Sequence, residues 1–157
     1  MRPVPSPFER TLKELWTQLG LRPDTPRHEP ATRLVADGIS LTLLDRLPLG
    51  IAVEAEIVRL ADEPPEQSRQ LTAALEMNLG LLLDCRATIH RRATRDGTWL
   101  VARSFVPYTV NAFETLIRSI EDSISSADFA GKQLSRASHG GKDARPKPAR
   151  TKMMLPL

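Results

Sequence analysis

Hydrophobic and polar positions follow two different periods along this chain. Residues 7–19 place apolar side chains every three or four positions, which is the spacing of one helical face. Ser6 and Glu9 have the spacing of a helical capping box at the start of this segment. Helical spacing recurs at about 67–83 and at about 109–125. The pattern therefore predicts three helices.

Strict alternation of apolar and polar side chains predicts strands between these helices. Two strands flank Asp37-Gly38, a pair that suits a two-residue hairpin turn, and a second hairpin is expected at Asp96-Gly97. A third strand should follow the turn at Pro48-Leu49-Gly50. The predicted strands cover residues 32–36, 39–47, 51–58, 87–92 and 99–105. We therefore expect an α+β fold with an antiparallel sheet of about five strands and three helices, in the order α-β-β-β-α-β-β-α.

The central helical segment, Gln67–Leu83, carries more apolar surface than one face of a small core needs. A helix that is apolar on nearly every side is either deeply buried or shared with a second molecule. Gly80 either ends this helix as a C-cap or lies inside it and permits a close helix contact, and we favour the C-cap. The main stripe, expected to be buried, consists of Leu71, Leu75, Leu79 and Leu82.

Length and charge divide the chain into two parts. A chain of 157 residues with 41% hydrophobic and 26% charged residues is expected to form one globular domain. The formal net charge of +3 comes from the end of the sequence, because residues 130–157 carry many basic side chains and only Asp143 as an acidic one. We expect a mildly acidic domain at 1–129 and a basic, disordered tail at 130–157. The basic residues of the tail are Lys132, Arg136, Lys142, Arg145, Lys147, Arg150 and Lys152.

The sequence contains no apolar run long enough to span a membrane, which needs about 18 residues. Glu9 and Glu14 interrupt the stretch where a signal peptide would need an apolar core. Cys85 is the only cysteine, so an internal disulfide is excluded and a reducing compartment is favoured. We therefore expect a cytoplasmic protein that does not insert into membranes.

Residues suited to catalysis or metal binding are scattered. No two of His28, His90 and His139 have the spacing of metal ligands, and no phosphate-binding glycine loop is present. Glu54 and Glu56 share one face of a predicted strand, where a solvated sheet face is a simpler interpretation than a carboxylate pair. The sequence therefore predicts no catalytic residues, no metal, no cofactor and no enzymatic activity.

The basic tail raises the possibility of nucleic-acid binding, because a flexible basic arm can neutralise phosphates without sequence specificity. The few aromatic residues, however, have the spacing of core positions rather than of a stacking platform. Arg91, Arg92, Arg95 and Arg103 make the second hairpin locally basic, which is typical of a protected sheet edge. Nucleic acid is therefore the less favoured partner.

Four features carry a family resemblance: the order of elements and the segments Leu41-Thr42-Leu43-Leu44, Leu75-Glu76-Met77-Asn78-Leu79 and Phe105-Val106-Pro107. Together they resemble type III secretion chaperones of the CesT/SycE-like class. The resemblance covers about residues 5–128. Length and the basic tail resemble the HpaB-type general chaperones of plant-pathogenic bacteria, whereas a long tail departs from the compact pattern of the class.

The resemblance implies a non-enzymatic homodimer that binds extended segments of effector proteins and keeps them competent for secretion. It also implies docking at the export apparatus, where the secretion ATPase releases the cargo. The residues implied to form the dimer are Leu71, Leu75, Leu79, Leu82 and Trp99. The residues implied to bind cargo are Leu12, Leu15, Trp16, Leu19, Leu34, Ile39, Leu41 and Leu43.

Two other functions remain open at this point. One is a nucleic-acid-associated regulator that acts through the basic tail, and the other is a partner-binding regulator of the same fold that handles no secretion cargo.

Overall fold

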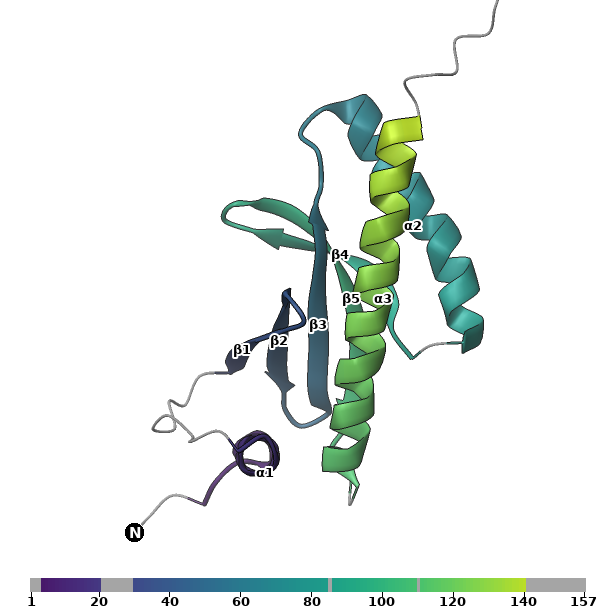
Figure 1. Ribbon diagram of the computed structural model, residues 1–157. Helices are drawn as coiled ribbons and strands as arrows, with labels where there is room; N and C mark the ends of the chain where they lie inside the picture. The colour runs from purple at the N-terminus through teal and green to yellow at the C-terminus, as the bar shows by residue number, and fades with distance from the viewer. Residues whose placement is uncertain (1–3, 21–29, 85, 110, 141–157) are drawn as a thin grey trace, which may run out of the picture.

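The computed structural model describes residues 4–20, 30–84, 86–109 and 111–140. The elements follow the predicted order and confirm the α+β fold, with three helices and a five-stranded antiparallel sheet (Figure 1). Their bounds are α1 Pro7–Gln18, β1 Ala31–Ala36, β2 Ile39–Arg46, β3 Gly50–Arg59, α2 Pro64–Asp84, β4 Thr88–Thr94, β5 Gly97–Pro107 and α3 Ala112–Gly140.

Local sequence explains how the first helix begins. The Ser6 hydroxyl accepts a hydrogen bond from the Glu9 backbone N–H at 3.1 Å, and the Glu9 carboxylate accepts one from the Ser6 N–H at 2.8 Å. This reciprocal pair is the predicted capping box, which satisfies two backbone donors at the helix start.

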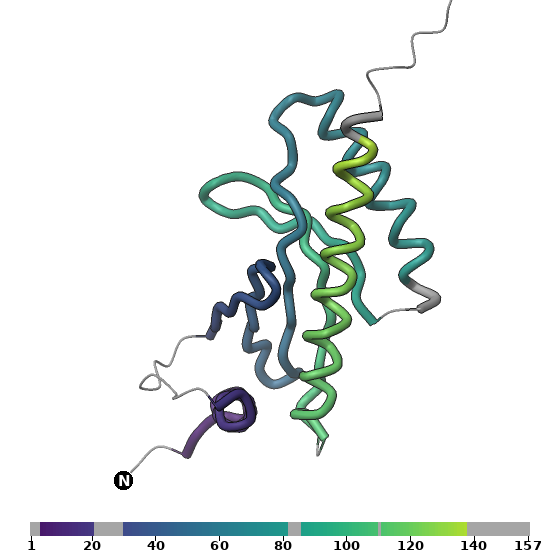
Figure 2. The backbone as a smooth tube through the Cα atoms, viewed as in Figure 1, coloured from purple at the N-terminus to yellow at the C-terminus, as the bar shows by residue number. Residues whose placement is uncertain are grey.

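The sheet has the strand order β1-β2-β3-β5-β4, so β1 and β4 form its two edges. The long helix α3 runs beside β3 and β5, and α2 lies on the far side of α3 from β1 and β2 (Figure 2). Alternate residues of the central strands, such as Leu43, Val53 and Val106, are fully buried in the core shared with Leu116 of α3. A second core under α2 contains Ala74, Leu81, Ile89, Leu100 and Leu134 among its members.

The central strand β3 is longer than its pairing with β2. The β2 pairing ends at Leu41 opposite Ala55, whereas the β5 pairing continues to Arg59 opposite Trp99. The β3–β5 register shifts between Glu56 and Val58, which marks a bulge. β3 therefore leaves β2 at about the point where its own backbone becomes irregular.

Helix α2 does not end where the sequence analysis placed its end. The helix continues through Gly80 to Asp84, so the favoured C-cap is wrong and the alternative, a glycine inside the helix, is correct. Leu81, directly after the glycine, is buried in the second core, and its packing supports the extra turn. Tertiary packing has overridden the local preference of glycine.

Helix α3 extends well beyond the predicted end at residue 125 and reaches Gly140. Ala130 is fully buried and Leu134 is 4% exposed, so this part of the helix belongs to the folded domain. The expected disorder of residues 130–157 is therefore wrong for residues 130–140, and the remainder of the predicted tail lies outside the described residues. The apolar spacing continues at helical period where the average composition had already become polar.

Candidate functional site

One side of α2 exposes large apolar side chains. Leu75 is 68% exposed and Leu79 is 72% exposed, whereas Ala74 and Leu81 on the same helix are buried. The expectation that the leucine stripe is buried is therefore wrong for the single chain, because the buried side of the helix is a different one. Leu75 and Leu79 lie one helical turn apart and form an exposed apolar strip, the leucine strip, that a partner could cover.

The other residues of the implied dimer interface lie in different surroundings. Leu71 is partly buried against the second core. Leu82 lies in α2, but its side chain falls outside the described residues. Trp99 lines a cleft with β3 and the C-terminal half of α3, and none of the residues lining that cleft comes from α2. The single chain thus brings Leu75 and Leu79 together and places Trp99 elsewhere.

A second apolar feature of α2 is the groove between it and α3. The groove encloses about 660 Å³ and is lined by Met77, Gly80 and Phe129, among other residues. Phe129 is 47% exposed, which is unusual for a large aromatic side chain in a small domain. Gly80 lies inside α2 and has no side chain, so it leaves the α2 wall of the groove low at this point.

Asn78 fixes α2 to the edge of the sheet. Its side-chain amide donates a hydrogen bond to the Ile89 carbonyl at 2.9 Å, and its side-chain oxygen accepts one from the Ile89 N–H at 2.6 Å. Both bonds go to backbone groups of the edge strand β4, so Asn78 satisfies a donor and an acceptor that a neighbouring strand would otherwise pair. The leucine strip is therefore held in a defined position relative to this edge.

The implied cargo residues fall into a buried and an accessible group. Leu15, Leu41 and Leu43 are 0–1% exposed and Leu12 is 9% exposed, and all four belong to the main core. Leu19, directly after α1, is 54% exposed. Three further residues are only partly buried, namely Trp16, Leu34 and Ile39. In this structure only the second group presents surface to a ligand.

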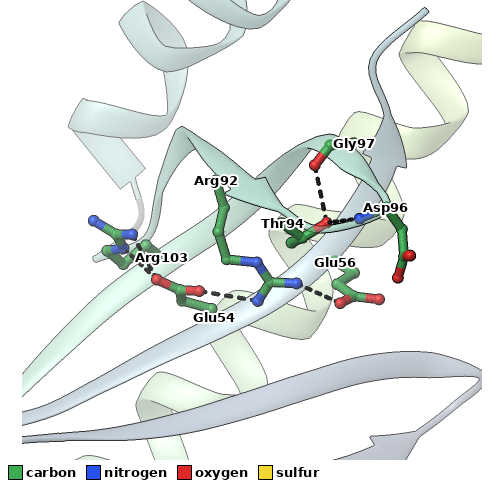
Figure 3. Close-up of polar contacts among 7 residues, drawn as sticks. All are labelled: Glu54, Glu56, Arg92, Thr94, Asp96, Gly97 and Arg103. Atoms are coloured by element: carbon green, nitrogen blue, oxygen red, sulfur yellow. Dashed lines mark hydrogen bonds and ion pairs between the residues drawn. The ribbon is translucent and has the colours of Figure 1, made fainter.

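The face of the sheet that carries Glu54 holds a polar network (Figure 3). Glu54 is 1% exposed and accepts hydrogen bonds from Arg92 at 3.0 Å and from Arg103 Nε at 2.9 Å. Arg92 also forms an ion pair with Glu56. The interpretation of Glu54 and Glu56 as a solvated face is therefore wrong for Glu54, whose charge is compensated by two guanidinium groups.

Arg92 and Arg103 do more than protect a hairpin edge with charge, which is the only role that the sequence analysis assigns to them. The register explains why they meet Glu54, because Arg103 is paired with Glu54 across β3 and β5. Arg92 comes from the next strand, on the same face. The alternation of the strands could have indicated the shared face, but the register between β3 and β5 was needed to bring the charges together.

Two titratable groups beside these elements have shifted pKa values. Burial lowers the pKa of His90, the positive charge of Arg103 lowers it further, and Glu54 acts in the opposite direction. Burial and the hydrogen bond that Tyr108 donates to Asp45 at 2.7 Å raise the pKa of the Tyr108 phenol. The Nε2 atom of His90 is hydrogen-bonded to the Thr88 hydroxyl at 2.7 Å, on the exposed surface of β4.

Within the described segments, no group of three or more histidine, cysteine, aspartate or glutamate residues could hold a metal ion. No helix in the same part of the chain is long and apolar enough to cross a membrane. Three surface features stand out in the described part of the chain: the leucine strip of α2, the α2–α3 groove and the cleft beside Trp99.

Comparison with known proteins finds a likeness in structure and none in sequence. No protein-family model and no curated protein matches the sequence. A chain in the HopA1-SchA chaperone-effector complex matches with a TM-score of 0.64 and 16% sequence identity, over 83% of this chain and 99% of that chain. A chain of the heterodimeric ExoU-SpcU complex, from the type III secretion system of Pseudomonas aeruginosa, has a TM-score of 0.54 and 19% identity. That match covers 76% of this chain and 93% of the other.

The chain has the fold of type III secretion chaperones. The fold expected from the resemblance is thus confirmed. The same fold also occurs in YbjN from E. coli, a proposed transcription regulator, with a TM-score of 0.54 and 18% identity. That match covers 83% of this chain and 92% of YbjN. The fold by itself therefore does not specify one function.

Proposed function

We propose that this chain is a type III secretion chaperone. It binds extended segments of effector proteins in the cytoplasm, keeps them competent for secretion and delivers them to the export apparatus. The observation that supports this function best is the chaperone fold itself, shared with chains solved in complex with effectors. The exposed apolar side chains of α2 and of the end of α1 also suit a protein that binds other chains.

We propose that the working form is a homodimer joined through α2. Leu75 and Leu79 lie one helical turn apart, and both are more than two thirds exposed in the single chain. Removing two leucine side chains from water on each protomer contributes about 1.5–3 kcal/mol for each fully buried side chain. The symmetric contact would place the same strip of both copies against each other.

The cargo surface is proposed to lie at the accessible members of the implied set. Leu19, Trp16, Leu34 and Ile39 present apolar surface, whereas Leu15, Leu41 and Leu43 support it from the core. An unfolded effector segment loses conformational entropy when it binds, so a handful of apolar contacts leaves only modest affinity. Modest affinity suits a delivery protein, because the secretion ATPase must be able to remove the cargo.

A genetic experiment tests this function. The gene is deleted in the source organism, and the amount of each type III effector is measured inside the cells and in the culture medium. We expect at least one effector to disappear from the medium, and the intact gene to restore it. Unchanged secretion of every effector would contradict the proposal.

A double variant connects the secretion defect to the surface. Trp16→Ala with Leu19→Ser removes accessible apolar side chains and should fail to restore secretion. Glu14→Ala changes an exposed residue of the same helix and serves as the matched control. Leu19 is exposed, Trp16 is partly buried and neither belongs to the main core, so both proteins should be equally abundant in the cells, which immunoblotting of cell lysates checks.

A second candidate is a regulator of the same fold that handles no secretion cargo, favoured by the likeness to YbjN. The basic residues after 140 could give such a regulator an affinity for nucleic acid that depends steeply on salt. RNA sequencing of the deletion strain distinguishes the two. A regulator predicts changed transcripts with normal secretion, whereas a chaperone predicts changed secretion with unchanged effector transcripts.

A further inference from the structure

The last residues of the central strand β3 have no strand neighbour on the β2 side among the described residues. β2 pairs with β3 only as far as Leu41 opposite Ala55. β2 itself continues toward its own turn and there pairs with β1, where Ile39 lies opposite Ala36. In the described part of the chain, no strand therefore occupies the β2 side of β3 over residues 56–59. An interior strand normally has neighbours on both sides over its length.

A cleft lies at this position. It encloses about 530 Å³ between the β1–β2 turn, β3, β5 and the C-terminal half of α3. Ile39, Ile57 and Trp99 contribute apolar surface, and Lys132 and Arg136 of α3 line the opposite side. Backbone groups of a strand and alternating apolar positions are what an extended peptide recognises when it adds to a sheet.

The charges of the cleft favour an acidic ligand. Glu56 is paired with Arg92, and Asp128 is paired with Lys132. Arg136 has no ion-pair partner within the described segments, although its guanidinium group is exposed at the rim. A carboxylate brought by a ligand would complete a charge-assisted hydrogen bond there.

Gly131 makes room on the helical wall. It lies in the interior of α3, where glycine is less favourable than alanine by roughly 0.5–1 kcal/mol. A Cβ atom at this position would meet no other atom within 4 Å, so the fold itself does not require a glycine. The missing side chain keeps the helical wall of the cleft low between Ala127 and Ser135, which also line it.

We propose that this cleft binds one short extended segment of an effector, with alternating apolar and acidic side chains. The segment adds to β3 in line with β2, along residues 56–59, and places a carboxylate at Arg136. Four residues of strand cover roughly 13 Å, so the segment is a short one. This inference rests on the proposed chaperone function and assigns one contact of its cargo, in a cleft that shares Ile39 with the cargo surface proposed above.

The test uses a synthetic peptide of about ten residues that alternates valine and aspartate, a length suited to one short strand. Hydrogen exchange of the full chain is followed by NMR at the amides of Ile57, Val58 and Arg59. We expect the peptide to slow exchange in this segment. The same peptide with a methyl group on every backbone amide nitrogen has no N–H donor for a strand ladder and should give no protection. Equal protection by both peptides, or none by the first, would overturn the proposal.

Two variants locate the binding site. Gly131→Leu fills the cleft from the helix and should weaken peptide binding on the order of tenfold or more, because the ligand and the new side chain compete for one volume. Glu121→Leu introduces the same side chain at an exposed position of α3 and should bind as the wild type does. Both variants should unfold in urea at or above the wild-type concentration. Unchanged affinity of Gly131→Leu would contradict the site.

A charge exchange tests the orientation of the ligand. Arg136→Glu should bind the aspartate peptide more weakly, and a peptide with lysine in place of aspartate should recover the affinity. If effector secretion depends on the chain but the peptide gives no protection, only the cleft assignment fails. If the peptide protects residues 57–59 but no effector depends on the chain, the cleft stands and the chaperone function fails.

Discussion

Asn78 of α2 and Ile89 of β4 are joined by two hydrogen bonds, one in each direction between the side-chain amide and the backbone. This pairing connects a helix that exposes a leucine strip to an edge strand of the sheet. The amide is suited to the task because it carries both a donor and an acceptor on one planar group.

Replacing Asn78 with aspartate should therefore destabilise the fold. A carboxylate can still accept from the Ile89 N–H, but it cannot donate to the Ile89 carbonyl, which is left unsatisfied. We expect a loss of about 1–3 kcal/mol in the free energy of unfolding, measured by urea denaturation. Thr72→Ala, at an exposed position of the same helix, should change stability by less than about 0.5 kcal/mol. A stable aspartate variant would show that the pair contributes little.

Glu54→Gln should destabilise the sheet more than Glu56→Gln does. Glu54 is almost completely buried and contacts two guanidinium groups, so its neutralisation removes the carboxylate partner of Arg103 and one of the two partners of Arg92. We expect a loss of about 3 kcal/mol for Glu54→Gln, typical of breaking a buried ion pair from one side. Glu56 is more exposed and contacts only Arg92, so the same change there should have a smaller effect. Equal urea midpoints for the two variants would contradict this difference.

Leu75→Asp and Leu79→Asp should convert the proposed dimer to a monomer. An aspartate in a dry symmetric contact would be buried without a partner on both protomers. Leu75→Met retains an apolar side chain of similar volume and should leave the dimer intact. Size-exclusion chromatography with light scattering measures the mass, and circular dichroism verifies that the variants are folded. A wild-type monomer at micromolar concentration would refute the interface.

Truncation at two points should show how much of α3 the folded domain needs. A chain that ends after residue 129 loses Ala130 and Leu134, which are buried in the second core, and should be markedly destabilised. Leu134→Ala alone should lose about 2–5 kcal/mol. A chain that ends after residue 140 retains every described contact and should unfold at the wild-type urea concentration. Equal stability of the two truncations would exclude this role of the last helical turns.

His90 should make stability depend on pH. The pKa of His90 is lower in the folded chain than the value of about 6.5 in the unfolded chain, so the unfolded state binds a proton first on acidification. Stability should fall as the pH decreases below about 6.5, and the fall should be smaller in His90→Asn. Urea denaturation at about pH 7.5 and about pH 5.5 measures the difference, which is modest because His90 is largely exposed. An identical pH dependence in the variant would contradict the shift.

The sequence was sufficient for element order because each element carries its own period. Alternation in residues 51–58 placed Glu54 and Glu56 on the face opposite to Val53, and the structure agrees. The ion pairs of Glu54 could not be predicted in the same way. They depend on the register between strands that are about fifty residues apart in the chain, and short-range patterns carry no information on register.

The errors at the helix ends have a common physical origin. Gly80 is a poor helix former, yet Asn78 before it and Leu81 after it are both held by tertiary contacts that keep the helix intact. Ala130 and Leu134 continue the buried spacing of α3 through a segment whose overall composition is polar and basic. In both places the tertiary contacts of two side chains outweighed the low helix preference of the surrounding sequence. The candidate site could not be predicted for the same reason. Whether Leu75 is exposed and Leu41 is buried depends on how the helices pack on the sheet, and local sequence patterns do not determine that packing.

The length of α3 gives the molecule a mechanical property. Its 29 residues form one continuous rod of about 44 Å. The N-terminal part of the rod packs with α1 through the main core, and its C-terminal half forms one wall of the cleft beside Trp99. Buried residues run from Leu116 near its start to Leu134 near its end, so the rod is fixed to the sheet along its length and keeps its two ends at a set distance. Two contacts of one cargo chain, one at each end of this helix, would then have to match that fixed spacing.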